Sequence, residues 1–362
     1  MIRHSLLLLR SLFIFILLGA STMTFAETEH ATDPALTALA QRLRSGDIPG
    51  IHSVIVQQHG KTLAEWYFEG HDQTIWRDLG QVKFTRETLH DVRSVTKSVV
   101  SMLFGIAMSE GAVTNLDAPV LDWFPEYPQL RTPERLRIRV RDVLSMTSGL
   151  HWDEWTYPYT DPRNAEIAMS MAEDPYLYVL SQAVDAPPGT RWAYSGGDVA
   201  LIGAVIARAV KMPIEQYAQL KLFGPLGMTS EWSQNKGVAM AASGLRLTPR
   251  SMAMLGQLVL NQGRFDGAQR VPADWMALST THKIDTASMD VPGGGYGYLW
   301  WLGNPQPDLH WIGAIGNGGQ RIWIVPSRDL VVVTTAGLYD TPNQGKAPFD
   351  ILAAILMALP QP

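Results

Sequence analysis

The sequence predicts an α+β fold in which strands from both ends of the chain form one antiparallel sheet. Helices flank this sheet, and a mainly helical region is inserted between its two halves. Two runs rich in β-branched and aromatic residues, 51–57 and 62–68, surround His59-Gly60-Lys61, which is a hairpin pattern. Four further strand patterns lie near the C-terminus, at 296–302, 309–315, 320–325 and 330–335.

These patterns place the sheet region at about 50–110 and 285–362 and the helical region at about 111–284. Asp33-Pro34 predicts the start of a helix that ends near Arg44, because aspartate caps helices and proline suits their first turn. A looser polar loop is expected between the hairpin and residue 94. Further helices are expected after 115–119, at 139–150, from 198 and at 349–359.

Residues 1–26 are predicted to be a secretory signal peptide that precedes a single domain, 27–362. Arg3 and Arg10 accompany a short apolar run, 6–18, and Thr24-Phe25-Ala26 offers small residues for cleavage. An uncleaved N-terminal anchor is the alternative. The chain contains no cysteine, so disulfides and a lipid attachment site are not expected. We expect a periplasmic or secreted bacterial protein with no stable membrane span once the signal is removed.

The composition indicates a chain with a substantial core and a mildly acidic surface. Hydrophobic residues make up 46% and charged residues 17% of the sequence. Without the signal segment, which carries two arginines and no acid, 27 basic residues face 34 acidic ones. No basic run is present, so a small-molecule substrate is expected and a nucleic-acid partner is not. The chain lacks a nucleophile elbow, a zinc-protease motif and a phosphate loop, and its histidines show no metal spacing, so neither a metal nor a cofactor is expected.

The candidate nucleophile is in Ser94-Val95-Thr96-Lys97, at the start of a long apolar run that ends near Gly111. Ser94, Lys97, Ser98 and Ser101 fall on one face of the helix, which is otherwise apolar nearly all round. Burial should lower the pKa of Lys97, so that the amine can take the proton of Ser94. The ordinary alternative is a helix start with a solvated lysine.

Two other segments could contribute to a site. Tyr194 follows a rigid loop, 187–190, and directly precedes a helix. Residues 151–178 form a stretch rich in tryptophan and tyrosine, which is either a packed cover or the wall of a binding site.

Read together, Ser94-x-x-Lys97, Tyr194-Ser195-Gly196 and Gly318-Gly319-Gln320 resemble the ordered motifs of the serine β-lactamase and penicillin-binding-protein superfamily. The chain looks closest to its class C-like branch, which includes esterases, D-stereospecific peptidases and 6-aminohexanoate-dimer hydrolases. The resemblance extends from about residue 51 to the C-terminus. Supporting segments are 141–150, 223–228 and 244–249.

The resemblance implies a β-lactamase/transpeptidase-like fold and a role for each matching residue. Ser94 would be the nucleophile that carries the acyl group. Lys97 would activate it, and Tyr194 would act with Lys97 as general base and then as acid. The backbone N–H groups of Ser94 and Gln320 would form the oxyanion hole.

Two departures from the family pattern shape the expected substrate. Gly196 stands where the pattern Tyr-x-Asn has a side-chain amide, and Asn317 stands where β-lactamases carry the lysine of Lys-Thr-Gly. Without that amide and that cation, we expect poor activity on β-lactams. Gly318 and Gly319 would permit close approach of the substrate, and Trp155 and Tyr157 would contact its apolar part.

We therefore expect a serine hydrolase that acts through an acyl-enzyme on small carboxylesters or amides. One alternative is a DD-peptidase that shares the chemistry but acts on cell-wall peptides. Another is a penicillin-binding-like protein that captures or senses such peptides without turning them over.

Overall fold

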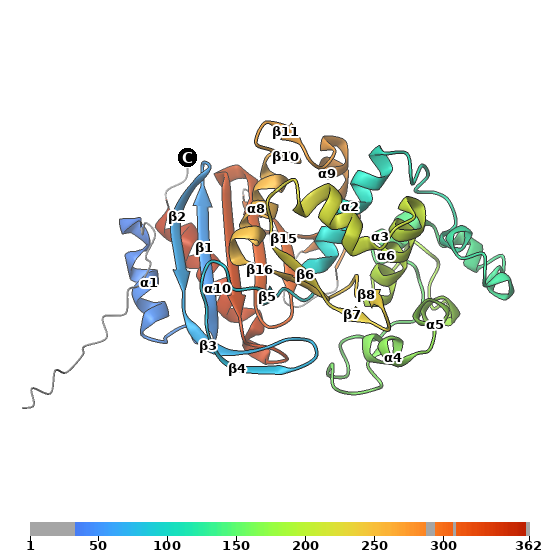
Figure 1. The fold of residues 1–362 in the computed structure, drawn as a ribbon, viewed down its shortest axis with the longest axis horizontal. Coiled ribbons are helices and arrows are strands. Elements are labelled where there is room, and N and C mark those ends of the chain that lie inside the picture. The colour runs from blue at the N-terminus through green and yellow to red at the C-terminus, as the bar shows by residue number, and fades with distance from the viewer. Residues whose placement is uncertain (1–32, 287–293, 307–308, 360–362) are drawn as a thin grey trace, which may run out of the picture.

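The computed structural model describes residues 33–286, 294–306 and 309–359 (Figure 1). The segment predicted to be a signal peptide lies outside these residues. Eight antiparallel strands form the main sheet in the order β12-β13-β14-β15-β16-β17-β1-β2. Their bounds are β1 Ile51–Gln58, β2 Lys61–Tyr67, β12 Ile284–Asp285, β13 Gly295–Tyr296, β14 Trp301–Gln306, β15 Leu309–Gly316, β16 Gln320–Val325 and β17 Leu330–Ala336.

The sheet joins the two ends of the chain, as the sequence predicted. Strand β1 pairs with β17 from Ile51 opposite Ala336 to Gln58 opposite Leu330. Strand β17 is buried along its whole length, because helices cover both faces of the sheet. Helices α2 (Val95–Ser109) and α8 (Pro249–Leu260) contact one face, and α10 (Lys346–Ala358) covers the other together with α1 (Thr37–Arg44) (Figure 1). The predicted α+β fold is confirmed.

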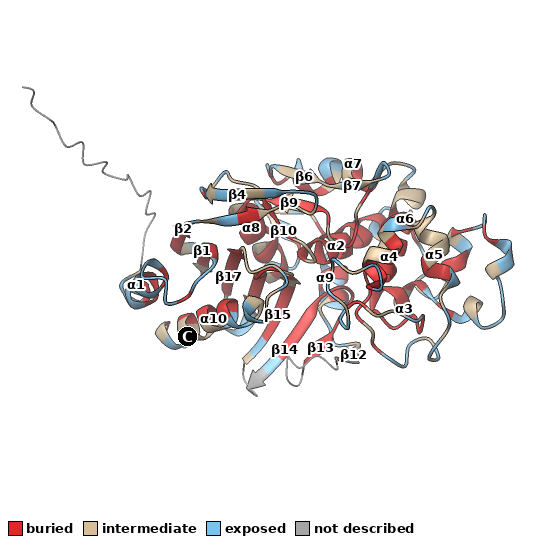
Figure 2. Ribbon diagram, turned by 90° about the horizontal axis from the view of Figure 1, so that it is seen from below, coloured by how far each residue is buried: buried red, intermediate tan, exposed pale blue. Residues whose placement is uncertain are grey.

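Helix α2 is buried between the sheet and the helical region (Figure 2). Every residue from Val95 to Ala107 is buried, because α6 (Gly196–Val210) packs on one side of α2 while β15 and β16 pack on another. The hydroxyl groups of the polar stripe are hydrogen-bonded. Ser98 Oγ donates to Leu299 O at 2.7 Å, and Ser101 Oγ donates to Tyr298 O at 2.7 Å. These bonds fix the loop between β13 and β14 to the helix that carries Ser94.

The helical region lies between the two halves of the sheet in the sequence. Its helices are α3 Val140–Leu144, α4 Ala165–Met171, α5 Pro175–Ser181, α6, α7 Ile214–Ala218, α8 and α9 Ala273–Ser279. Three small sheets accompany these helices. The first contains β5 His90–Asp91, β6 Ser230–Trp232 and β9 Leu245–Leu247. The other two are the pairs β7 Gln234–Asn235 with β8 Val238–Ala239, and β10 Arg264–Phe265 with β11 Ala268–Gln269.

Three local expectations were wrong. The polar loop after the first hairpin contains a second hairpin, β3 (Glu69–Gln73) and β4 (Asp78–Lys83), in which only Asp72 is buried, so the strand pattern was hidden. The helix expected after residue 119 is only a 3₁₀ turn, Val120–Trp123. The strand expected at 296–302 is split in two, because Leu299 turns the backbone with φ +63°.

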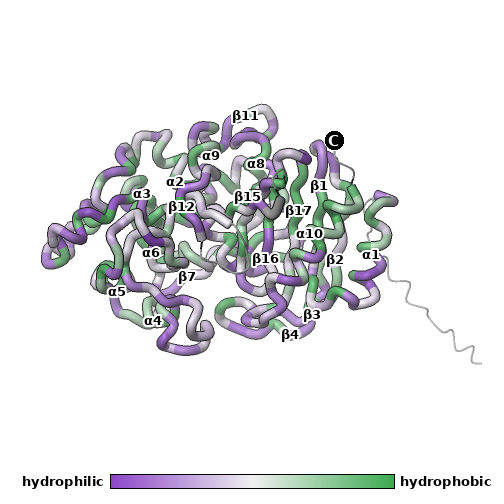
Figure 3. Tube along the Cα trace, turned by 180° about the vertical axis from the view of Figure 1, so that it is seen from behind, coloured by the Kyte–Doolittle hydropathy of each residue, from purple (hydrophilic) through white to green (hydrophobic). Residues whose placement is uncertain are grey.

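Hydrophobic residues gather along the central strands β1 and β17 (Figure 3). Within the described residues, we find no helix with the length and apolar character needed to cross a membrane.

Candidate active site

Ser94 is held at the N-terminus of α2 by a tight turn. It is the N-cap residue, and the preceding residue, Arg93, has the left-handed φ of +50°. Thr96 Oγ1 donates to the carbonyl of Arg93 at 2.6 Å, which fixes this turn from inside the helix. Such a backbone conformation is uncommon outside glycine, and it presents the Ser94 side chain to the cleft described below.

Lys97 lies one turn along the same helix and donates to the Ser94 hydroxyl. Its Nζ atom is 3.0 Å from Ser94 Oγ and 2.9 Å from the carbonyl oxygen of Ala242. The side chain is only 2% exposed, which rules out the solvated lysine considered above. Lys97 is thus aimed at Ser94 by its place on the helix and by a carbonyl from a distant segment.

Tyr194 completes the group from the opposite side. Its loop is anchored where Ala193 N donates to Met146 O at 3.0 Å and Gly189 N to Thr147 O at 2.8 Å. Lys97 Nζ lies 4.9 Å from the centre of the Tyr194 ring. Burial raises the pKa of Tyr194 above 10.0, and the charge of Lys97 together with hydrogen bonds to Ser94 and Lys97 opposes that rise in part.

The charge state of Lys97 differs from the expectation. Burial is the strongest single influence and lowers its pKa, as predicted. Tyr194, Glu154 and Glu166 act in the other direction, and together they raise the pKa of Lys97 above its usual 10.5. We conclude that Lys97 is an ammonium group at neutral pH, because Tyr194 and two buried acidic residues that the sequence did not reveal act on it.

Glu154 and Glu166 lie on either side of Gly196. Glu154 is buried and accepts three hydrogen bonds, from Trp152 Nε1 at 2.8 Å, Tyr159 OH at 2.8 Å and the backbone N–H of Gly196 at 2.7 Å. Glu166 is also buried, and its pKa is raised to about 8 by burial and by Glu154, against the lowering influence of Lys97. Only their position in the fold identifies these two acids, since neither belongs to a sequence motif.

The three residues Ser94, Lys97 and Tyr194 meet at a cleft of about 190 Å³, where Ser94 and Tyr194 form part of the wall. Its aromatic lining consists of Trp155, Tyr159, Tyr194, Trp301, Trp323 and Phe349, and its other lining residues are Ser94, Ile315, Gly316, Asn317, Arg321, Gln344 and Gly345. The Trp155 ring stacks on that of Tyr194 at 5.5 Å between centroids and remains 54% exposed. The aromatic segment is therefore a cleft wall at Trp155 and Tyr159.

Tyr157, which was expected beside Trp155, does not line the cleft. Its ring instead packs under the guanidinium of Arg163, 4.2 Å away. The segment turns sharply here, because Asp153 accepts from the backbone N–H groups of Trp155 and Thr156. This turn places Tyr159 rather than Tyr157 at the cleft.

Strand β15 reaches the nucleophile at its last residue. A β-carbon on Gly316 would lie 2.3 Å from Val92 O and 3.2 Å from Ser94 N, so only a bare backbone fits there. Among the described residues, the backbone N–H groups of Ser94 and Asn317 donate no hydrogen bond. Two unused donors therefore occur at residues that line the same cleft.

Gln320, expected to supply the second oxyanion donor, is fully buried and does not line the cleft. Its side chain donates to Ala336 O at 2.6 Å and accepts from Ala336 N at 3.1 Å. Gly318 and Gly319 also lie outside the cleft lining, with φ of +89° and +98°. They form the turn between β15 and β16, where Gly318 N donates to Gln344 Oε1 at 2.9 Å.

The histidines include one group that could hold a metal ion. The ligand atoms of His52, Asp72 and His90 lie within 4.8 Å of one another, and all three residues are buried. His52 Nδ1 and His90 Nε2 are already 2.9 Å apart, which is a hydrogen-bond distance. Tyr339 OH donates to Asp72 at 3.0 Å. The group is satisfied as a hydrogen-bonded cluster, and none of its members lines the cleft.

The profile of the family described as Beta-lactamase matches residues 36–354. The 6-aminohexanoate-dimer hydrolase of Paenarthrobacter ureafaciens is 24% identical over 301 residues, which cover 77% of this chain and 70% of that protein. A beta-lactamase of Escherichia coli strain K12 is 21% identical over 94% of this chain and 98% of its own length.

Solved structures show the same fold. A putative 6-aminohexanoate-dimer hydrolase from Bacillus anthracis superposes with a TM-score of 0.72 at 18% identity, covering 88% of this chain and 83% of that one. EstCE1, described as a hydrolase with promiscuous acyltransferase activity, superposes with a TM-score of 0.68 at 17% identity, over 89% of this chain and 97% of its own.

Proposed function

Because the chain belongs to the Beta-lactamase family, whose related members include ester and amide hydrolases, we propose that it is a serine hydrolase acting through an acyl-enzyme. The observation that supports this most is the 3.0 Å hydrogen bond between Lys97 Nζ and Ser94 Oγ beside the Tyr194 ring. A nucleophile, a cation and a phenol that converge on one cleft are the parts needed for acyl transfer.

In the proposed reaction, Ser94 Oγ attacks the carbonyl carbon of the substrate and gives its proton to the pair formed by Lys97 and Tyr194. The same pair returns that proton to the leaving group, and the acyl group stays on Ser94. Water then attacks the carbonyl of this acyl ester, the pair takes a proton from the water and gives it to Ser94 Oγ as the ester bond breaks, and the acid product leaves. Because Lys97 is cationic at rest and the pKa of Tyr194 is raised, the pair must first lose one proton to act as base.

The negative oxygen of the tetrahedral intermediate requires two donors. We assign them to the backbone N–H groups of Ser94 and Asn317, since both residues line the cleft and both N–H groups lack a partner among the described residues. This assignment replaces Gln320, which is buried. Removing one such donor typically lowers kcat by about 10²- to 10³-fold in related chemistry.

The cleft favours small substrates with an apolar, uncharged acyl group. Its volume is about 190 Å³, and six of its thirteen lining residues are aromatic. Asn317 offers no positive charge, and Gly196 offers no side-chain amide. Carboxylesters need the least help for their leaving group, so they should be turned over faster than amides, and β-lactams slowly.

A panel of chromogenic esters, D-amino-acid amides and a cephalosporin tests this proposal, with Ser94→Ala as the blank. We expect the highest kcat/KM on a neutral ester of a small acid. If the cephalosporin is turned over faster than every ester, the proposed substrate class is wrong. We also propose export to the periplasm or the cell exterior, on the basis of the N-terminal sequence alone. The substrate panel does not test this second proposal.

The DD-peptidase alternative has one observation in its favour. Arg321 lines the cleft, and a guanidinium group is a natural partner for the free carboxylate of a peptide. However, its N–H groups already donate to the carbonyl oxygens of Gly316, Gln320 and Gln344, and the side chain is 5% exposed. Release of D-alanine from a wall-type peptide in the same panel would favour this alternative. A stable adduct without turnover would favour a sensing role.

A further inference from the structure

The carboxylate of Glu166 occupies the place where a side chain of residue 196 would begin. A β-carbon on Gly196 would lie 1.6 Å from Glu166 Oε2 and 2.6 Å from Glu166 Cδ. The carboxylate in its present position and any side chain at 196 therefore exclude each other. The family pattern has an asparagine at this position, and the Glu166 carboxylate occupies the space where that side chain would begin.

Glu166 is held in this place by its own helix terminus. It is the second residue of α4, and its backbone N–H donates to the side chain of the N-cap residue Asn164 at 3.0 Å. Asn164 is fully buried and also donates to Glu154 O at 3.0 Å and Tyr157 O at 2.8 Å, which ties α4 to the cleft wall. The Glu166 side chain is 7% exposed, and its Oε2 atom has no hydrogen-bond partner within the described residues.

A buried carboxylate oxygen without a donor is unfavourable for stability, so its retention calls for another role. The nearby charged and titratable groups supply one. Lys97 on α2 and Glu154 before α4 act on Glu166 through their charges, and Tyr159 in turn feels the charge of Glu166. The charge of Glu166 also helps to keep Lys97 protonated.

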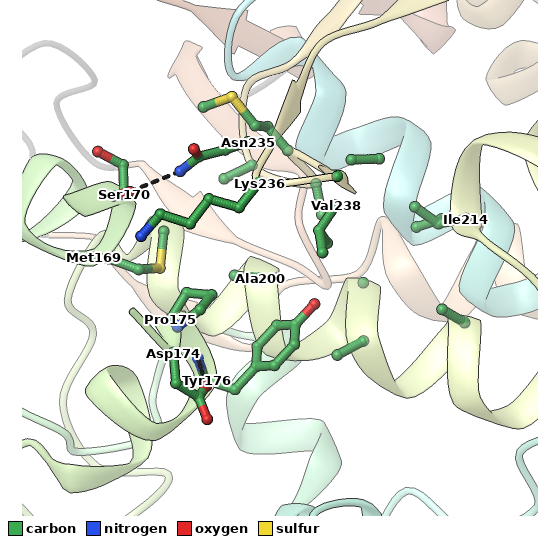
Figure 4. A pocket seen from close by; sticks show the side chains of 18 of the residues that line it. Met169, Ser170, Asp174, Pro175, Tyr176, Ala200, Ile214, Asn235, Lys236 and Val238 are labelled. Atoms are coloured by element: carbon green, nitrogen blue, oxygen red, sulfur yellow. Dashed lines mark hydrogen bonds between the residues drawn. The ribbon is translucent and has the colours of Figure 1, made fainter. Parts of the chain in front are cut away.

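Glu166 lines a second cavity of about 660 Å³ and is not among the residues that line the substrate cleft. Figure 4 shows this second cavity from close by. This cavity lies between α4, α5, α6, α7 and the hairpin β7–β8, and Asn235 Nδ2 closes one side by donating to Ser170 O at 2.7 Å. Ala242, whose carbonyl accepts from Lys97, belongs to the same wall. Other charged or titratable side chains that line the cavity are Tyr127, Glu173, Asp174, Tyr176, Arg208, Glu215 and Lys236.

We propose that Glu166 is a positioning residue that replaces the missing asparagine of the Tyr-x-Asn pattern and sets the charge state of Lys97 from the cavity side. This inference rests on the proposed hydrolase function. Glu166 touches neither the cleft nor the reacting atoms, so it acts only through Lys97. When its proton leaves through the cavity, the extra negative charge stabilises the Lys97 ammonium and opposes ionisation of Tyr194. The resulting expectation is a loss of activity as Glu166 ionises, near pH 8.

The test compares Glu166→Gln, Glu166→Ala, Gly196→Asn and the double variant Glu166→Ala/Gly196→Asn with wild type. For each, kcat/KM on the best ester is measured between about pH 6 and pH 10. We expect Glu166→Gln to remove the inflection near pH 8, because glutamine cannot ionise. The single change Gly196→Asn should lower activity by at least about tenfold, and Glu166→Ala in the same chain should restore most of it.

Glu173→Gln is the matched control, since Glu173 lines the same cavity but is exposed, and it should leave the pH profile unchanged. An unchanged inflection in Glu166→Gln overturns the inference, as does a double variant no more active than Gly196→Asn alone. Melting temperatures identify a variant that fails to fold. If a single Glu166 variant fails to fold, the comparison of the double variant with Gly196→Asn still tests the inference. Labelling of Ser94 by a fluorophosphonate distinguishes a failure of this inference from a failure of the proposed hydrolase function. A labelled, active wild type with unaffected Glu166 variants overturns this inference only, whereas an unlabelled, inactive wild type overturns the hydrolase function as well.

Discussion

Asn317 and Asp340 hold each other by two hydrogen bonds at the mouth of the cleft. Asn317 Nδ2 donates to Asp340 Oδ1 at 2.6 Å, and the backbone N–H of Asp340 donates to Asn317 Oδ1 at 3.0 Å. The side chain of Asn317, which the sequence motif matches to the β-lactamase lysine as a prediction, is therefore already paired. Its backbone N–H group, by contrast, has no partner among the described residues and remains available to an oxyanion.

This pairing changes the route to β-lactam activity. Asn317→Lys should raise the ratio of kcat/KM for a cephalosporin to that for a p-nitrophenyl ester only slightly, because Asp340 would pair with the new ammonium group. Asn317→Lys/Asp340→Ala should raise the ratio by about tenfold, since the cation is then free for the substrate carboxylate. Asp340→Ala alone is the control. Equal ratios in the wild type and the double variant would show that position 317 does not meet the substrate.

The addition of Gly196→Asn, which the sequence alone would recommend for the same purpose, should be harmful. Its side chain would meet the carboxylate of Glu166. We expect Asn317→Lys/Gly196→Asn to lose ester and cephalosporin activity together, by about tenfold or more. Parallel assays on both substrates test this expectation, and a selective gain on the cephalosporin would contradict it.

The activity of the wild type at low pH should depend on loss of a proton from the pair formed by Lys97 and Tyr194. The pKa values of both groups are raised, so the reactive form is scarce at acid and neutral pH and becomes more populated as the pH rises. Lys97→Arg should be almost inactive at every pH, because arginine stays protonated and is larger than the buried site allows. Lys61→Arg, on the exposed start of β2, is the control. An active Lys97→Arg enzyme would mean that this residue only supplies charge.

The aromatic wall should decide which acyl groups are accepted. Trp155→Ala removes a ring that stacks on Tyr194, so KM for esters of bulky apolar acids should rise by about tenfold or more. The effect on an acetate ester should be much smaller, because a short acyl group does not reach the ring. Trp76→Ala is a suitable control, since Trp76 is 58% exposed and does not line the cleft. The same rise in KM for acetate and for bulky esters would show that Trp155 has only a structural role.

The buried cluster of His52 and His90 should make the fold sensitive to acid. Burial lowers the pKa of His52 to about 3 and that of His90 to about 4, both below the usual 6.5. The unfolded chain therefore binds more protons between about pH 6.5 and pH 4, and the stability gained from neutral imidazoles falls as the pH decreases through that window. Melting temperatures measured across it should drop, and His52→Phe, which keeps a ring against Phe84, should flatten the drop. An equal drop in the variant would place the acid sensitivity elsewhere.

The sequence predicted those parts of the fold and site that depend on local pattern. The apolar run after Ser94 is typical of a buried helix, and its stripe of polar residues predicted that Lys97 lies beside Ser94. The loop before Tyr194 was visible from its prolines and glycine. These features lie within one element or one turn, so spacing alone describes them.

The remaining site residues depend on contacts between distant segments. Glu166 reaches Gly196 only because α4 packs near the start of α6. Gln320 was predicted to be an oxyanion donor because it follows two glycines. Those glycines form the turn from β15 to β16, so the cleft is lined by the preceding residues, Gly316 and Asn317. The expectation that Tyr157 contacts the substrate failed for a similar reason, because a turn at Asp153 changes the direction of the segment.

The most direct test of the central claim is the mass of the intact protein during turnover. After rapid mixing with a slowly hydrolysed ester or a fluorophosphonate, the wild type should gain one acyl or phosphonyl group, and peptide mapping should place it on Ser94. Ser94→Ala should gain no mass and lose at least about a thousandfold in kcat/KM while keeping its melting temperature. An adduct on another residue, or a Ser94→Ala protein with more than about a tenth of wild-type activity, would contradict the account.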